Sequence, residues 1–217
     1  MNQTLEAVIF DLDGVIVDTA KYHYLAWKRL AKELGYDLSE ADNEHLKGVS
    51  RMRSLEIILE LAGVSKSVAE MEEMAFRKNE WFKDYIKSIK PEEIFEGIPE
   101  LIKDIKSNNK KIALASSSKN AQEVIQLLQI ADVFDAVVDG NMIEHTKPDP
   151  EIFLLAAKKL DLPPAQCVVI EDAEAGVEAA LAAGMKCVGV GHPNQLGKAN
   201  LVIPNMQQLQ YADLLNL

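Results

Sequence analysis

Two aspartates stand one residue apart at the point where an apolar stretch ends. In the segment VIFDLDG, Asp11 and Asp13 come directly after a short β-branched run that is typical of a buried strand. Glu171 and Asp172 follow another such run in the same way. In an open parallel sheet, ligands bind beyond the carboxyl ends of the strands, so these side chains are expected to converge. The polar residues after the other runs are Ser116, Ser117, Ser118, Lys119, Asn120 and, farther from its strand, Lys147.

Four carboxylates in one crevice would repel one another and raise one another's pKa unless a cation compensates their charge. An all-oxygen set of ligands is typical of Mg²⁺, which keeps bound water and also binds phosphate oxygens. Beside Mg²⁺ and a lysine, Asp11 would stay ionised and attack a phosphorus atom, while Asp13 would act as general acid and base. Lys147 would offset charge on the transferring group, and the Ser116 hydroxyl with nearby backbone N–H groups would hold its oxygens. The pattern therefore indicates phosphoryl transfer through an aspartyl phosphate.

Each of these features also has an ordinary structural interpretation. Aspartates commonly follow strands and cap helices, and the segment ASSSKN could be a capping loop. Lys147 precedes a proline and could lie on the surface, and Glu171 with Asp172 could cap the next helix. What favours the catalytic interpretation is that all of these residues occur in order, each after an expected strand.

Short β-branched runs alternate with segments of helical period along most of the chain. This alternation predicts an α/β fold, with a parallel sheet covered by helices on both faces. The exception is the first connection, which at about a hundred residues is too long for a single crossover. Its apolar stripes are helical throughout, so we expect a core domain of residues 1–15 and 91–217 with an inserted helical bundle of residues 16–90. The expected strands are residues 7–10, 111–115, 136–138, 167–170, 187–190 and 201–203.

The insertion contains polar residues that its helical pattern alone does not explain. Lys78 falls on an apolar stripe, where the pattern favours an ammonium group that extends to solvent over one that lines a polar pocket. His23 and Trp27 are four residues apart on one expected helical face, which more often reflects packing than a site. The segment KGVSR, residues 47–51, combines two cations with a glycine and a serine at the expected start of a helix. It could bind the phosphate that is not transferred, or Ser50 could simply form a solvated N-cap.

The segments DLDGVIVD, ASSSKN, KPDP and EDAEAG resemble, in order and at suitable spacing, the four motifs of the haloacid dehalogenase superfamily. The resemblance covers essentially the whole chain. It implies a Rossmann-like core with a helical cap, Asp11 as nucleophile and Asp13 as acid and base. It also implies that Mg²⁺ is held by Asp11, the carbonyl group of Asp13, Glu171 and Asp172. The substrate-binding residues implied in the core are Ser116, Ser117, Ser118, Lys119, Asn120 and Lys147.

The insertion also resembles the sugar-phosphate mutases of this superfamily, through DTAKYHYLAWKRLA, LKGVSR and RKNEWF. This resemblance implies interconversion of β-D-glucose 1-phosphate and glucose 6-phosphate through β-D-glucose 1,6-bisphosphate. Lys78 would then bind substrate, and His23 would take part in catalysis by aligning Asp13 as the cap closes. The other substrate-binding residues implied in the insertion are Trp27, Lys47, Gly48, Val49, Ser50, Arg51 and Ser54.

The composition limits the partners and the location. With 34 acidic and 23 basic residues, the formal charge is −11, which would repel a nucleic-acid backbone. No apolar run approaches the roughly 18 residues of a membrane span, and we expect no signal peptide. Cys167 and Cys187 lie in apolar runs and are expected to be buried free thiols, which suits a reducing cytoplasm. We therefore expect a cytoplasmic monomer that acts on small sugar phosphates, without a nucleic-acid or membrane partner.

Two rival functions would use the same residues. A sugar-phosphate or phosphoglycolate phosphatase would share the core, with water as the acceptor, and most members of the superfamily are phosphatases. A non-catalytic regulator could bind a sugar phosphate in the same pocket. Such a binder would have no need of the nucleophile, so the intact set of Asp11, Asp13, Lys147 and Asp172 argues against it.

Overall fold

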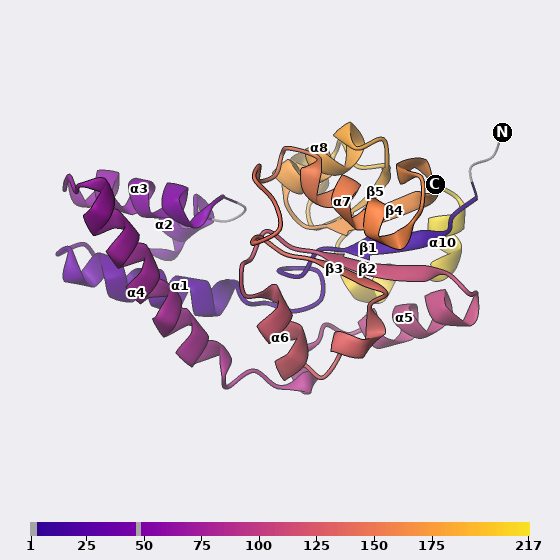
Figure 1. The fold of residues 1–217 in the computed structure, drawn as a ribbon, viewed down its shortest axis with the longest axis horizontal. Helices are drawn as coiled ribbons and strands as arrows, with labels where there is room; N and C mark the ends of the chain where they lie inside the picture. Colours follow the sequence, from indigo (N-terminus) through magenta and orange to yellow (C-terminus); the bar gives the residue numbers. More distant parts are fainter. Residues whose placement is uncertain (1–3, 47–48) are drawn as a thin grey trace. The chain divides into compact units, whose positions relative to one another are not determined.

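The computed structural model describes residues 4–46 and 49–217 (Figure 1). It divides into two compact units, one made of Met1–Asp18 with Lys90–Leu217 and the other of Thr19–Ile89. We call them the core unit and the helical unit. Val17 belongs to the core unit because it forms β-bridges with both Asp13 and Ile94. The chain therefore leaves the core unit a few residues later than the sequence pattern suggests.

The core unit is built on a six-stranded parallel sheet with the order β3-β2-β1-β4-β5-β6. This is the order of Rossmann-type folds, in which the chain begins in the middle of the sheet and winds outward in both directions. The carboxyl end of β1 therefore lies where the winding reverses. The strands are β1 (Ala7–Phe10), β2 (Lys111–Ala115), β3 (Ala136–Val138), β4 (Cys167–Glu171), β5 (Lys186–Val190) and β6 (Leu201–Ile203). The predicted α/β fold is confirmed, and each strand matches its expected run to within one residue.

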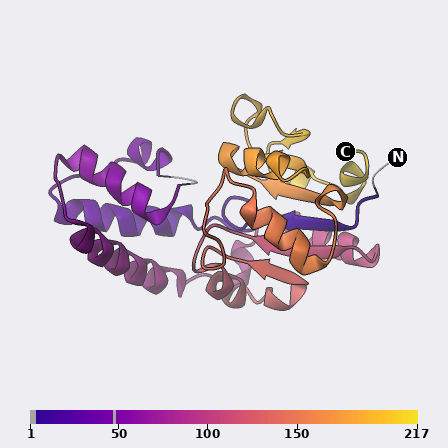
Figure 2. The ribbon, with the colours of Figure 1, turned by 45° about the horizontal axis from the view of Figure 1, so that its top comes forward.

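Helices cover both faces of this sheet. Helices α7 (Glu151–Leu160) and α8 (Glu174–Ala182) lie on one face, and α5 (Ile98–Ser107) lies on the other (Figures 1 and 2). All four residues of β1 are consequently buried, as its continuous apolar run requires. The other helices of the core unit are α6 (Ala121–Leu127), α9 (Pro193–Leu196), α10 (Tyr211–Leu215) and the short 3₁₀ helices η1 (Pro91–Glu93), η2 (Ala131–Val133), η3 (Pro164–Gln166) and η4 (Met206–Gln208).

The helical unit consists of α1 (Ala20–Glu33), α2 (Glu40–Glu44), α3 (Arg51–Ala62) and α4 (Val68–Ile86). Helices α3 and α4 begin after Ser50 and Ser67, and each serine hydroxyl accepts a hydrogen bond from the backbone N–H three residues later. Helix α3 ends at Gly63, whose φ of 66° suits glycine. Within the described residues, no helix has the length and apolarity needed to cross a membrane. The buried core of the unit is made of Trp27, Leu30, Ala31, Leu38, Leu46, Leu55, Ile58, Leu59, Met74 and Ala75.

Candidate active site

Asp11 lies at the carboxyl end of β1, where the winding of the sheet reverses. Its backbone N–H donates to the carbonyl oxygen of Ile170 at 3.0 Å, which ties this position to β4. The chain then turns tightly at Gly14, whose φ of 77° favours glycine and whose N–H donates to the carbonyl oxygen of Val17. A Cβ atom at Gly14 would overlap the carboxylate of Asp172. The turn after β1 therefore packs directly against the acid pair at the end of β4.

Lys147 links the ends of β1 and β4. Its Nζ donates to Asp11 Oδ1 at 2.6 Å, to Glu171 Oε1 at 2.5 Å and to the carbonyl oxygen of Ala115 at 3.3 Å. The Lys147, Asp11 and Glu171 side chains are only 7%, 9% and 1% exposed. Desolvation opposes the charged form of Lys147, but the two carboxylates outweigh it and raise the pKa of this lysine. One ammonium charge thus faces two buried carboxylates, so the site retains negative charge.

The acidic groups of this crevice are shifted towards protonation. Desolvation raises the pKa of Asp11 to about 6, although Lys147 opposes the shift. Desolvation and the charge of Asp11 raise the pKa of Asp13 to about 8. The pKa of Asp172 is also raised to about 8, by desolvation and then by the neighbouring carboxylates, although the residue as a whole is exposed. The crevice therefore holds more carboxyl groups than its single lysine can keep ionised.

The segment after β2 is folded by its own hydroxyl groups. Ser116 Oγ accepts from the backbone N–H of Ser118 at 3.1 Å, and Ser118 Oγ accepts from that of Asn120 at 3.2 Å. Ser116 and Asn120 are buried, Ser117 is half-buried and Lys119 is exposed. A hydroxyl group that accepts one hydrogen bond can still donate one. Ser116 is therefore suited to donate to an anionic oxygen at the end of β2.

In the helical unit, Lys78 is buried in an aromatic environment. The residue is 1% exposed, so the interpretation favoured by the pattern alone, an ammonium group extended to solvent, is wrong. Its Nζ lies 2.7 Å from His23 Nδ1 and 4.4 Å and 5.2 Å from the ring centroids of Trp27 and Phe82. The His23 ring also stacks on Phe82, with centroids 3.9 Å apart. These ring faces and the imidazole nitrogen stabilise a charge that would be costly to bury alone.

Burial and the contact with Lys78 together fix the protonation of His23. Desolvation, and then the charges of Lys78 and Arg51, hold the pKa of His23 well below its usual 6.5. The imidazole is therefore neutral, and because Lys78 can only donate, Nδ1 is the acceptor. The remaining ring proton is then on Nε2, which makes that atom a hydrogen-bond donor.

The segment before α3 shows the N-cap that was one of its two interpretations. Ser50 Oγ accepts from the N–H of Arg53 at 3.2 Å. Ser54 is buried, and its hydroxyl group donates to the carbonyl oxygens of Ser50 at 3.2 Å and Leu46 at 3.4 Å. Val49 is exposed and Arg51 is half-buried, and phosphate binding by these residues stays a prediction. The predicted site residues Lys47 and Gly48 lie outside the described residues.

The family of the chain follows from comparison with known proteins. A sequence model of the haloacid dehalogenase-like hydrolase family matches residues 8–190. The chain belongs to this family. It is 46% identical to the β-phosphoglucomutase of Bacillus subtilis, over 94% of this chain and 92% of that protein. The crystal structure of a β-phosphoglucomutase from Clostridium difficile is 47% identical and has a TM-score of 0.94, covering 98% of this chain and 96% of that one. A phosphorylated carbohydrates phosphatase of Thermotoga maritima is 34% identical over 98% of both proteins.

The donor set of this haloacid dehalogenase-like site suits a divalent cation. Asp11 and Asp172 offer hard oxygen ligands, and their raised pKa values mean that a cation would relieve the repulsion between them. Glu171 is already engaged, because Oε1 accepts from Lys147 and Oε2 accepts at 2.9 Å from a backbone N–H at the start of α8. Lys147 lies between Asp11 and Glu171 and so separates these two carboxylates. Each carboxylate oxygen can still accept a further interaction, so these bonds do not prevent Glu171 from sharing a cation with Asp172.

Two residues that contribute to the core-unit site are absent from the set predicted from the sequence. Phe153 contacts the ammonium group of Lys147, with 4.9 Å between Nζ and the ring centroid, but its sequence signal is that of an ordinary core residue. Gly176 leaves room for Glu171, whose carboxylate a Cβ atom would overlap. Gly176 could have been predicted from its place in the segment EDAEAG, which also contains Glu171.

Proposed function

We propose that the chain is a β-phosphoglucomutase, which interconverts β-D-glucose 1-phosphate and glucose 6-phosphate through β-D-glucose 1,6-bisphosphate. The observation that carries the proposal is the identity of 46% and 47% to two proteins of that name, over nearly their whole lengths. The buried Asp11–Lys147–Glu171 group at the end of β1 supports it, because phosphoryl transfer to a carboxylate needs a nucleophile held beside a cation.

In this proposal Asp11 is the nucleophile. One of its oxygens forms a bond to the phosphorus of the bisphosphate while the bond from phosphorus to the sugar oxygen breaks. Asp13 gives its proton to that leaving oxygen, and its pKa of about 8 keeps it protonated at neutral pH. In the next half-reaction Asp13 takes a proton from the attacking sugar hydroxyl, and the phosphoryl group leaves Asp11. Lys147 and Ser116 stabilise the negative oxygens of the transferring group.

We further propose Mg²⁺ as the cation, held by Asp11, the carbonyl group of Asp13, Glu171 and Asp172. Bound there, Mg²⁺ would neutralise charge on the carboxylates and on the phosphoryl oxygens. Octahedral coordination by oxygen with retained water is what distinguishes Mg²⁺ from the larger Ca²⁺ among hard cations. The raised pKa of Asp11, about 6, leaves part of this group protonated near pH 6, and a nearby dication would favour the ionised nucleophile.

The binding residues of the substrate are also proposals. Ser116, Ser117, Ser118, Lys119 and Asn120 would bind the transferring phosphate with Lys147, and Arg51 with Lys47, Gly48, Val49, Ser50 and Ser54 would bind the other phosphate. Lys78 and Trp27 would bind the sugar. His23 would act on the acid–base group through its Nε2–H, the one hydrogen-bond donor that its neutral ring retains.

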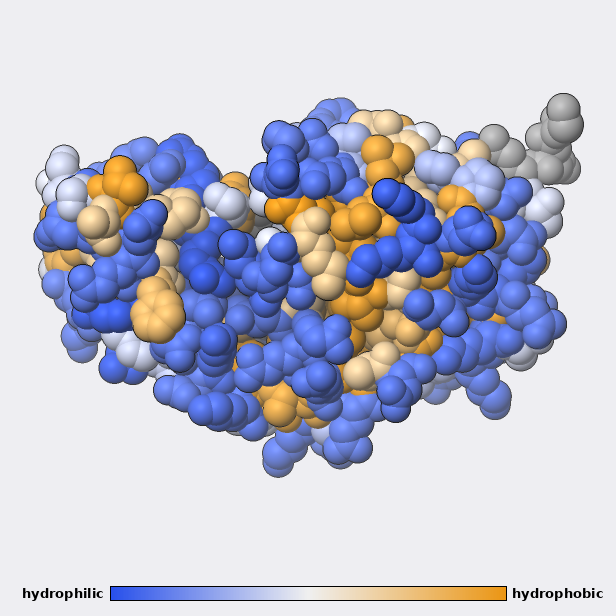
Figure 3. Space-filling model, viewed as in Figure 1, coloured by the Kyte–Doolittle hydropathy of each residue, from blue (hydrophilic) through white to orange (hydrophobic). Residues whose placement is uncertain are grey.

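We also propose a monomer that acts in the cytoplasm. The free thiols of Cys167 and Cys187 are both buried and suit a reducing compartment. On the face seen in Figure 3, apolar residues of the core unit form a connected patch that hydrophilic residues cover only in part, and in a monomer this patch stays exposed to solvent. Sedimentation equilibrium at micromolar concentration should give a mass near 24.0 kDa.

A sugar-phosphate phosphatase is the second candidate. The phosphorylated carbohydrates phosphatase of Thermotoga maritima, 34% identical over 98% of both chains, favours it. The two functions differ only in the acceptor, which is a sugar hydroxyl in the mutase and water in the phosphatase.

The deciding experiment supplies β-D-glucose 1-phosphate with Mg²⁺ and a trace of the 1,6-bisphosphate. Glucose 6-phosphate and free phosphate are measured in the same samples. The mutase yields glucose 6-phosphate with little free phosphate, and the Asp11→Asn variant yields neither. Free phosphate as the main product, formed at the rate of substrate loss, would instead establish the phosphatase.

A further inference from the structure

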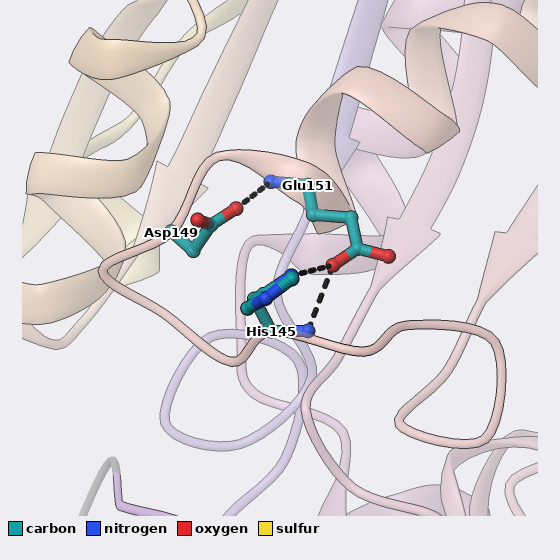
Figure 4. Close-up of side chains that lie close together, drawn as sticks. All are labelled: His145, Asp149 and Glu151. Atoms are coloured by element: carbon teal, nitrogen blue, oxygen red, sulfur yellow. Dashed lines mark hydrogen bonds and ion pairs between the residues drawn. The ribbon is translucent and has the colours of Figure 1, made fainter.

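The loop that carries Lys147 is closed by hydrogen bonds to a single carboxylate, that of Glu151. Glu151 is the first residue of α7, and its side chain reaches back along the chain (Figure 4). Oε1 accepts from the backbone N–H of Glu144 at 3.0 Å, and Oε2 accepts from that of His145 at 2.7 Å. His145 Nδ1 lies 3.1 Å from the same Oε2. Glu151 thus binds two successive backbone N–H groups on one side of Lys147, while its own backbone lies on the other side.

The same loop has a second brace at its carboxyl end. The backbone N–H of Glu151 donates to Asp149 Oδ1 at 2.9 Å, and the N–H of Asp149 donates to the carbonyl oxygen of Thr146 at 3.1 Å. Phe153, two residues into α7 and fully buried, places its ring 4.9 Å from the Lys147 ammonium group. The first turn of α7 therefore holds both the backbone that carries Lys147 and the charged end of its side chain.

His145, Asp149 and Glu151 also form the group of metal-type ligands whose atoms lie within 4.8 Å of one another in the described parts of the chain. Their hydrogen bonds account for this proximity without an ion. Both Glu151 oxygens accept from N–H groups, Asp149 caps the N–H of Glu151, and the His145 side chain is 68% exposed. The carboxylates of this cluster thus already stabilise the loop through hydrogen bonds.

We propose that Glu151 is a positioning residue for Lys147 in phosphoryl transfer. A lysine side chain is flexible, and Lys147 extends from a loop rather than from a strand or helix. Its ammonium group must nevertheless stay between Asp11 and Glu171, at 2.6 Å and 2.5 Å, to balance their charge. Through its hydrogen bonds, Glu151 fixes the position of the loop backbone from which the Lys147 side chain extends. The hydrogen bonds from Glu144 and His145 hold the pKa of Glu151 below its usual value, so it is a carboxylate with both oxygens available as acceptors.

This inference rests on the proposed phosphoryl-transfer chemistry of Asp11, and its test does not depend on the sugar. The rate of Asp11 phosphorylation is measured by intact mass after rapid quenching, with acetyl phosphate as the donor. Glu151→Gln keeps the size of the side chain but replaces one acceptor oxygen by an NH₂ group that cannot accept. The rate should fall by about tenfold or more, as expected when a reacting group is displaced by about 1 Å. His145→Ala should have a smaller effect, because both backbone hydrogen bonds to Glu151 remain.

The matched control is Glu144→Gln, the same chemical change in the same loop. The Glu144 side chain is exposed, and the described structure records no side-chain hydrogen bond for it, so the rate should stay within about twofold of the parent. Unchanged rates in Glu151→Gln would overturn the inference. A parent protein that is phosphorylated by acetyl phosphate but does not convert β-D-glucose 1-phosphate would contradict the mutase and leave this inference standing.

A double-mutant cycle separates positioning from a general effect on folding. In the Lys147→Met background there is no ammonium group to place, so Glu151→Gln should cost little further in rate. Equal losses of rate in both backgrounds, with the same fall in thermal midpoint, would show that Glu151 only stabilises the fold and would overturn the inference.

Discussion

The imidazole ring of His23 accepts a hydrogen bond from the buried ammonium group of Lys78, with 2.7 Å between Nδ1 and Nζ. A protonated ring could not accept this bond and would place a second positive charge beside the first. The histidine and the lysine therefore support each other only while the ring is neutral. This arrangement also dictates which ring nitrogen carries the proton, so one contact sets both the charge and the donor direction of His23.

The neutral state of His23 predicts a pH-dependent contribution to folding. Its pKa is well below 6.5 in the folded protein, and near 6.5 in the unfolded chain. As the pH falls below about 6.5, His23 binds a proton in the unfolded state but not in the folded state. The free energy of unfolding therefore decreases. Between pH 7.5 and 5.5 the loss from this group should be about 1.4 kcal/mol. His23→Gln keeps an acceptor for Lys78 but does not titrate, so urea titrations of this variant should show a loss smaller by that amount.

His45→Gln is the matched control, because His45 is an exposed histidine of the same unit. Its unfolding free energy should fall with pH as much as that of the parent protein. A His23→Gln variant with the same pH dependence as the parent would contradict the neutral state assigned to the ring.

At the scale of the element, helix α4 shows how a local signal and a tertiary role combine. The Ser67 hydroxyl accepts from the Glu70 N–H, and the Glu70 carboxylate accepts from the Ser67 N–H at 2.8 Å, which is a capping box. These bonds hold the pKa of Glu70 near 2, so the carboxylate is ionised throughout the neutral range. The helix that begins there carries Lys78 and Phe82 about three and four turns later, so its start helps to fix their orientation.

Removing the N-cap of α4 should lower stability by a predictable amount. Ser67→Ala leaves the first turn of α4 without its side-chain acceptor, and this should cost about 1 kcal/mol. Ser65→Ala is the control, since Ser65 is exposed and precedes the helix. Urea denaturation followed by circular dichroism should separate the two variants by a clear shift in midpoint. Equal midpoints would mean that the cap does not stabilise α4.

The elements of the core could be predicted because their signals are local. An apolar, β-branched run between polar segments is enough to locate a buried strand. The alternation of such runs with helical segments is enough to predict that the sheet is parallel. The placement of Asp11 and Glu171 at neighbouring strand ends followed from that topology. The reach of Glu151 back to the loop residues Glu144 and His145 did not, because no periodicity encodes which N–H groups a side chain will bind.

The environment of Lys78 shows the limit of pattern analysis more clearly. The helical period correctly places this lysine on the buried stripe. The same pattern favours an ammonium group that extends to solvent, which is wrong. What keeps the group buried is the combined position of His23, Trp27 and Phe82, from two helices. A sequence pattern reports the face on which a residue lies, whereas the partners that meet it there depend on how the helices pack.

At the scale of the whole molecule, the formal charge of −11 and the acidic crevice act in the same direction. General repulsion between acidic groups destabilises the folded state, and any salt relieves it by screening. A cation bound at the crevice would do more, because it binds only the folded protein and neutralises specific carboxylates. The two effects can be separated, since screening depends on ionic strength alone and binding depends on which cation is present.

Mg²⁺ should therefore raise the thermal midpoint more than NaCl does at the same ionic strength. At 100 times its dissociation constant, a bound cation adds about 2.7 kcal/mol to the free energy of unfolding. For a chain of this size, that corresponds to a rise in midpoint of roughly 5 to 10 °C. Asp172→Asn removes a proposed carboxylate ligand that lies against Gly14, so the midpoint of this variant should respond equally to Mg²⁺ and to NaCl. Asp213→Asn is the control, because it removes an acidic group in the same way but in α10, near the end of the sequence. The midpoint of this variant should keep the full response to Mg²⁺. If the parent protein also fails to distinguish Mg²⁺ from NaCl, the crevice does not bind Mg²⁺, and the proposed metal site is contradicted.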